Sequence, residues 1–80
     1  MSKELKKYNE VFKSIFNVDD KHILELEYKV YPEWNSMAQI ALISALEEEF
    51  AINFEADDIF SFTSYKVGLK MMKSRFGIDL

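Results

Sequence analysis

Apolar residues recur at intervals of three and four in three segments of the chain, which is the spacing of an amphipathic helix. The first segment covers residues 3–16, with Ser2 placed as an N-cap and a lysine-rich face opposite the apolar stripe. The apolar residues of this stripe, which we expect in the core and to which we assign no chemistry, are Leu5, Tyr8, Val11, Phe12, Ile15 and Phe16.

The second segment, residues 36–50, is rich in strong helix formers and carries more apolar residues than one buried face needs. A step of about 100° per residue divides it into a core side and a partly apolar surface edged by acids. The core side holds Leu42, Ile43, Leu46 and Phe50, with Gln39 among them. The second side holds Met37, Ile40, Ala41 and Ser44, next to Glu47 and Glu48. A purely structural helix would not need this second face.

Asn35 and Ser36, at the start of this helix, are both good N-caps. Gln39 stands three residues after Ser36, where the partner of a capping box would be. A helix start also has a positive local field that favours a phosphate ester. From the residues alone, Ser36 is either a cap or a site that another enzyme modifies, and the Ser-x-x-Gln spacing favours the cap.

The loop at residues 17–35 has no sustained period and is long for a compact domain, which is typical of a functional segment. We expect four apolar residues to pin it to the helices, namely Val18, Ile23, Leu24 and Leu26. His22, the only histidine, is expected to be a solvated side chain of this loop.

A short helix is expected at about residues 55–61, with Asp57 and Asp58 near its N-terminus. Ser64 is placed to cap a final helix that ends near Arg75, and Gly77 follows at the C-cap position. Residues 1–80 therefore form one domain, an all-α bundle with three main helices, one short helix and a long first loop.

Composition narrows the possible functions. The chain has no cysteine, so disulfides and cysteine-ligated zinc are excluded, and any thiol chemistry must be imported. It has no G-x-S-x-G motif and no partner in sequence for its one histidine, so we expect no catalytic site and no metal site. No apolar run is close to the length of a membrane span, about 18 residues, and no signal-peptide pattern is present. We therefore expect a soluble cytoplasmic protein.

Charge is distributed unevenly. Residues 17–60 hold eleven acids and two bases, a net charge of −9, while the two ends together carry +5, giving −4 in total. An acidic middle argues against nucleic acid, whose phosphates require a basic face. It favours a protein partner with a basic patch, although any single acid here serves solubility equally well.

The run Trp34-Asn35-Ser36-Met37, followed by Leu42-Ile43-Ser44-Ala45-Leu46-Glu47-Glu48-Glu49-Phe50, resembles the second helix of acyl carrier proteins. In that family an Asp-Ser-Leu motif opens the helix, and its serine receives 4′-phosphopantetheine from coenzyme A. The similarity extends to the order of elements: an amphipathic first helix, a long loop, a short third helix and a capped fourth.

The resemblance implies a discrete carrier, monomeric and without catalytic activity, that holds an acyl or aminoacyl thioester on phosphopantetheine attached to Ser36. Asn35 and Met37 would flank the attachment site. Partner enzymes would read the face formed by Met37, Ile40, Ala41, Ser44, Glu47 and Glu48. Those partners would be a phosphopantetheinyl transferase, a loading ligase and an acyltransferase or synthase. The cargo would pass between helices near Gly68, Met71 and Met72, although the two methionines taken singly favour ordinary packing.

Three departures from the family pattern bear on this implication: Asn35 replaces the motif's aspartate, Ala41 stands where fatty-acid carriers often have an acid, and Trp34 replaces a small residue. Tyr31-Pro32-Glu33-Trp34 and Thr63-Ser64-Tyr65 make the chain similar to stand-alone carriers of polysaccharide or specialised-metabolite pathways. The alternative is a carrier-like docking or scaffold protein that is not modified and acts through the acidic helix.

Overall fold

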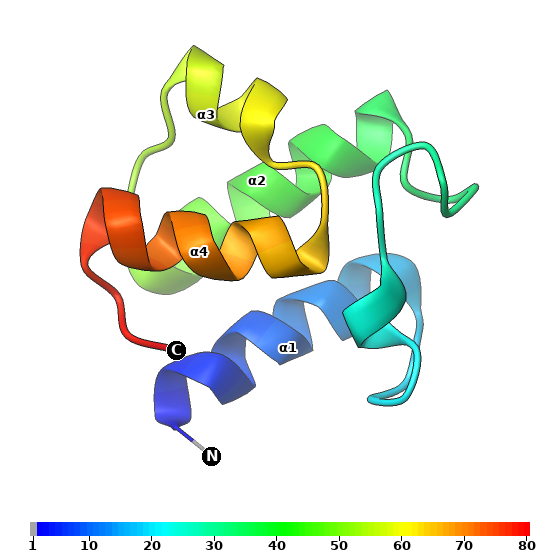
Figure 1. Cartoon of the computed structure of the whole chain (residues 1–80), viewed down its shortest axis with the longest axis horizontal. Coiled ribbons are helices and arrows are strands. Elements are labelled where there is room, and N and C mark those ends of the chain that lie inside the picture. The colour runs from blue at the N-terminus through cyan, green and yellow to red at the C-terminus, as the bar shows by residue number, and fades with distance from the viewer. Residues whose placement is uncertain (1) are drawn as a thin grey trace.

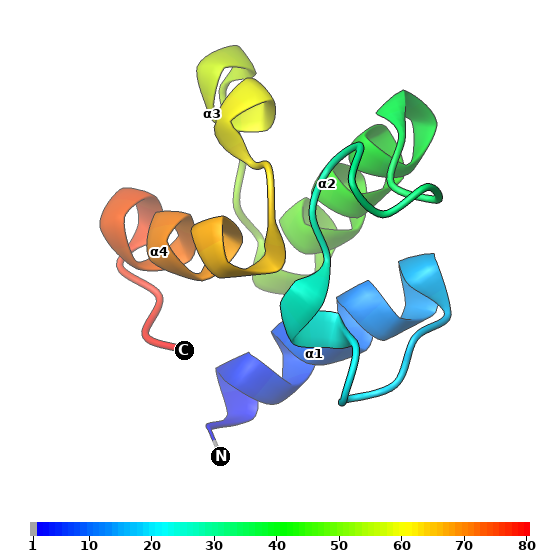
Figure 2. The ribbon, with the colours of Figure 1, turned by 45° about the vertical axis from the view of Figure 1, so that its right-hand side comes forward.

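The computed structural model describes residues 2–80, and this part of the chain contains four α-helices, one turn of 3₁₀-helix and no β-strand. In chain order these are α1 (Lys3–Phe16), η1 (Ile23–Glu25), α2 (Ser36–Phe50), α3 (Ala56–Ser61) and α4 (Tyr65–Phe76). In Figure 1, α4 lies above α1, with α2 behind it and α3 at the top. Figure 2 separates α2 from α3 and brings forward the loop that leads into α2. The predicted all-α bundle is confirmed.

The helix ends lie where the sequence predicts them. Ser2, Asn35 and Ser64 cap α1, α2 and α4, each with a side-chain oxygen that accepts the N–H three residues further on. These bonds, from Leu5, Ala38 and Val67, are each 3.0 Å long. Gly77 ends α4 in the left-handed conformation, at φ +66°, as predicted.

Trp34 lies at the centre of the core although it belongs to the loop before α2. Its side chain is fully buried. Its ring centroid lies 5.0 Å from that of Phe16 and 5.8 Å from that of Phe12, both on α1. Phe62, which follows α3, contributes a third neighbouring ring at 6.4 Å. One loop residue therefore packs against both α1 and the segment between α3 and α4.

Three of the four apolar residues expected to pin the long loop do so. Ile23 and Leu26 are buried, and Val18 is half-buried. The prediction for Leu24 is wrong, because its side chain is 51% exposed. Ile23 and Leu24 are neighbours in the tight turn η1, where consecutive side chains point in different directions, so burial of Ile23 leaves Leu24 in solvent.

Asp58 and Arg75 connect α3 to α4. Asp58 lies in the first turn of α3 and its carboxylate accepts the backbone N–H of Glu55, as expected of a helix-start acid. It is also buried, and it forms an ion pair with Arg75 at 2.9 Å. Asp57, its neighbour, is exposed. The bidentate contact with Arg75 stabilises the position of α3, which is only six residues long.

Candidate functional site

Ser36 is the first residue of α2, and its side chain is exposed. Asn35 caps the helix, so the Ser36 hydroxyl is not used for capping. Its side-chain oxygen lies 3.2 Å from the Tyr28 hydroxyl oxygen, within hydrogen-bond distance. The structure thus leaves the serine oxygen at the surface, which is what modification by another enzyme requires.

The predicted capping box between Ser36 and Gln39 is wrong. Gln39 is buried, and its side-chain oxygen accepts the indole N–H of Trp34. Its side-chain nitrogen donates to the carbonyl oxygens of Ile59 at 2.8 Å and Phe62 at 2.9 Å. A glutamine that satisfies three buried or partly buried polar groups is stabilised more by these bonds than by one exposed cap bond. Gln39 therefore connects α2 to α3 and to the core tryptophan.

Both faces of α2 are present, although Phe50, predicted on the core side, is only half-buried. Leu42, Ile43 and Leu46 are buried. On the outward side, the side chains of Met37 and Ile40 are 82% and 66% exposed. Ala41, Ser44 and Glu48 are exposed as well. Two large apolar side chains, three residues apart, are therefore exposed to solvent on one face of α2.

Glu47 differs from the other residues of the predicted partner face. It is half-buried, and its carboxylate accepts the backbone N–H of Phe54 at 2.8 Å. This bond holds the connection between α2 and α3, so Glu47 has a structural role in addition to any contact with a partner. Glu48 is the acid of the pair that lies fully on the surface.

A hollow of about 290 Å³ lies between α2 and α3, with Ser36 at its edge. Its walls are largely apolar, formed by Ile40 of α2 with Ile59 and Phe60 of α3. Gln39 and Phe62, which are buried, form its inner end. Phe60 is 82% exposed beside it. The serine hydroxyl, the apolar outward face of α2 and this hollow are therefore brought together.

Tyr28 and Phe60 are site residues that the sequence patterns missed. Tyr28 lies in a loop without periodicity, and Phe60 lies in a helix too short to show an apolar stripe. For both residues, the indication available in the sequence was an aromatic side chain that does not belong to any apolar helical stripe.

The region around Gly68, where we expected cargo to pass, is densely packed. A Cβ at this position would lie 2.1 Å from the Tyr8 hydroxyl oxygen and 2.3 Å from Phe62 Cζ. Met72 beside it is fully buried. The open space near Ser36 is the hollow between α2 and α3, not the interior next to Gly68.

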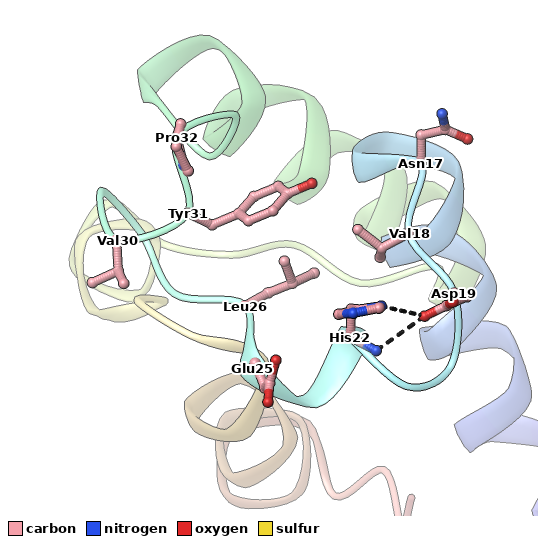
Figure 3. A pocket seen from close by; sticks show the side chains of 9 residues that line it. All are labelled: Asn17, Val18, Asp19, His22, Glu25, Leu26, Val30, Tyr31 and Pro32. Carbon is pink, nitrogen blue, oxygen red and sulfur yellow. Dashed lines mark hydrogen bonds and ion pairs between the residues drawn. The ribbon is translucent and has the colours of Figure 1, made fainter.

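A second hollow, of about 500 Å³, lies in the long loop and is drawn in Figure 3. Val18, Leu26 and Tyr31 line it together with His22 and Asp19, whose side chains are 2.7 Å apart. His22 is exposed, as expected, but the prediction that it has no partner is wrong, because its Nδ1 contacts Asp19 Oδ1. The hydrogen bond and the charge of Asp19 raise the pKa of His22, and the nearby charge of Glu25 acts in the same direction. The same hydrogen bond lowers the pKa of Asp19.

We expect the His22 titration, followed by NMR on the chain's single histidine, to have a midpoint above the ordinary value of about 6.5. Because the folded-state pKa is raised, the contribution of the pair to stability is present below the unfolded pKa of histidine and is lost as pH rises through the folded one. On the acid side it is lost as pH falls through the lowered pKa of Asp19. Asp19→Asn should lower the midpoint; an unchanged midpoint would contradict the contact.

Comparison of the chain with protein-family models, with curated proteins and with solved structures found no match. Within residues 2–80, no helix has both the length and the apolar character needed to cross a membrane. A functional proposal for this chain therefore depends on its own residues and their geometry.

Proposed function

We propose that this protein is an acyl carrier protein, modified on Ser36 with 4′-phosphopantetheine, and that it presents an acyl or aminoacyl thioester to partner enzymes. The observation that carries the proposal is the position of Ser36: an exposed hydroxyl at the first residue of a helix that has both a core face and an apolar outward face. The order of elements in the family that the sequence resembles, with a long first loop and a short third helix, agrees with the observed fold.

The chemistry of the chain supports attachment of a prosthetic arm. The protein has no cysteine, so a thioester needs a thiol from elsewhere, and phosphopantetheine supplies one at its end. A phosphate ester on Ser36 would lie at the N-terminus of a 15-residue helix, whose free N–H groups and dipole favour negative charge. Asn35 provides the cap that the aspartate of the family motif would provide.

The surface around Ser36 supports delivery to partners. Met37 and Ile40 extend the apolar surface from the serine, and Glu48 lies on the same side of α2. A partner with a basic rim around an apolar contact surface would match this arrangement, and its association would be fast and dependent on salt. The transferase, the loading ligase and the acyltransferase or synthase would each bind this surface in turn.

The test is transfer of the arm in vitro. The purified chain is incubated with coenzyme A and a broad-specificity phosphopantetheinyl transferase, and its intact mass is measured. We expect a gain of one phosphopantetheine group, lost completely in Ser36→Ala and retained in Ser44→Ala, a matched serine exposed on the same helix. No gain, under conditions that modify a control carrier, would refute the proposal.

The alternative function, docking or scaffolding without modification, is favoured by one residue. Asn35 lacks the charge that the modifying enzyme usually meets in this family. If the wild-type chain is not modified with phosphopantetheine but the Asn35→Asp variant is, the loss of that charge has disabled the site. The docking role then becomes the better account. Modification of wild type and of Asn35→Asp at similar rates would exclude that explanation.

A further inference from the structure

Tyr28 is held in place by the segment that joins α3 to α4. Its backbone N–H donates to the carbonyl oxygen of Thr63 at 2.8 Å. Just before it in the chain, Glu27 forms an isolated bridge with Ser64, and the N–H of Tyr65 donates to the carbonyl oxygen of Leu26 at 3.1 Å. The backbone at Tyr28 is therefore fixed, although it lies within the long loop.

The side chain of Tyr28 extends from this anchored backbone to the attachment site. It is half-buried, it lines the hollow between α2 and α3, and its hydroxyl oxygen lies 3.2 Å from Ser36 Oγ. Both residues reach this contact from backbones that are held by other bonds, since Ser36 belongs to the capped first turn of α2. The pair is therefore brought together by the fold.

Lys29 adds a positive charge beside the tyrosine. It is one of only two bases in residues 17–60, and its ammonium nitrogen lies 5.7 Å from the centroid of the Tyr28 ring. Its backbone is in the left-handed region, at φ +66°, with its N–H donating to the carbonyl oxygen of Trp34 at 3.1 Å. A lysine seldom adopts this conformation, and such residues concentrate at functional sites.

We propose that Tyr28 is the positioning residue for modification of Ser36, an inference that rests on the proposed function. Either hydroxyl of the pair can be the donor. In the proposed arrangement the phenol, the more acidic of the two, donates to Ser36 Oγ, and the serine proton is then free for the incoming transferase. In the transfer step, Ser36 Oγ forms a bond to the phosphorus that carries pantetheine in coenzyme A. The pyrophosphate P–O bond breaks, adenosine 3′,5′-bisphosphate leaves, and the serine proton passes to a base of the transferase.

After the transfer, the Tyr28 hydroxyl donates to a phosphate oxygen of the arm. A hydrogen bond to a charged acceptor is shorter and stronger than one between two hydroxyls. Tyr28 therefore stabilises the modified chain more than the unmodified chain. A residue with only a packing role would stabilise both forms equally.

The test compares Tyr28→Phe with Tyr31→Phe. Both variants lose only a phenolic oxygen; Tyr31 is also a half-buried loop tyrosine, and its ring packs against Phe16 at 6.0 Å. Three quantities are measured: kcat/KM for arm transfer from coenzyme A, the change in Tm on modification, and the ³¹P chemical shift of the attached phosphodiester.

For Tyr28→Phe we expect kcat/KM to fall about twofold to tenfold, the value of one hydrogen bond. The Tm of the unmodified chain should change little, the gain in Tm on modification should shrink, and the ³¹P signal should move. Tyr31→Phe should match wild type in all three.

Equal transfer rates, Tm gains and ³¹P shifts in wild type and Tyr28→Phe would overturn the role of Tyr28 while leaving the proposed function intact. Failure of the wild type itself to accept the arm would overturn both. A large fall in the Tm of unmodified Tyr28→Phe, with an unchanged ³¹P shift in its modified form, would assign the tyrosine to packing and refute the proposal.

Discussion

Trp34→Ala is expected to lower the free energy of unfolding by about 3–5 kcal/mol, the range for truncation of a buried tryptophan. The substitution removes the ring that packs against Phe12 and Phe16 and leaves the side-chain oxygen of Gln39 without its indole donor. A chain of 80 residues has a total stability of about 4–12 kcal/mol, so the substitution would remove between about a quarter and all of it. Urea unfolding followed by far-UV circular dichroism measures the change.

The matched control is Phe60→Ala, which truncates an aromatic residue that is 82% exposed. Its free energy of unfolding should stay within about 0.5 kcal/mol of wild type. Trp34→Phe should fall between the two, because a ring remains while Gln39 still loses its donor. Similar unfolding midpoints for Trp34→Ala and Phe60→Ala would show that Trp34 is not the centre of the core.

Gly68→Ala is expected to destabilise the protein by about 3 kcal/mol. Helix propensity alone predicts the opposite sign, a gain of about 1 kcal/mol for alanine over glycine inside a helix. The new methyl group would overlap the Tyr8 hydroxyl oxygen at 2.1 Å and the Phe62 ring at 2.3 Å. The Tyr8 hydroxyl cannot easily move, because it is buried and donates to the carbonyl oxygen of Tyr65 at 2.8 Å. Burial also raises its pKa well above the ordinary value.

The sign of the change in the urea midpoint decides this prediction. Ser74→Ala, an exposed site on the same helix, shows the effect of propensity without the overlap. A midpoint for Gly68→Ala that equals or exceeds wild type would mean that α1 and α4 can separate at this contact, and the close packing described for Gly68 would be wrong.

The helices could be predicted from the sequence because their determinants are local. Apolar spacing of three and four located α1, α2 and α4, and a polar residue before each of them supplied the cap. Gly77 marked the last helix end for the same reason. These determinants act over a few residues, and no knowledge of the packing is needed to use them.

Other features depend on contacts between residues that are far apart in the chain. The burial of Trp34 requires α1, and the ion pair of Asp58 with Arg75 spans 17 positions. Gln39 was assigned to the wrong bond because its acceptors, Ile59 in α3 and Phe62 just after it, are distant in the sequence. Local sequence patterns favour a capping bond for Gln39. Its stronger hydrogen bonds with distant residues form only in the assembled fold.

The candidate site likewise contains some residues that can be predicted from one helix and others that only the fold brings together. Ser36 and the outward face of α2 could be proposed from one helix, since all their members share its period. Tyr28 and Phe60 could not, because a loop and a six-residue helix contribute them separately. The hollow beside Ser36 exists only where these segments meet.

The most direct test of the carrier function is the mass of the chain isolated from the cells that produce it, with fragmentation to locate any added group. The account predicts a population heavier by one phosphopantetheine group, attached to Ser36 and absent from Ser44. A chain that is entirely unmodified, or that carries the group on another residue, would contradict it.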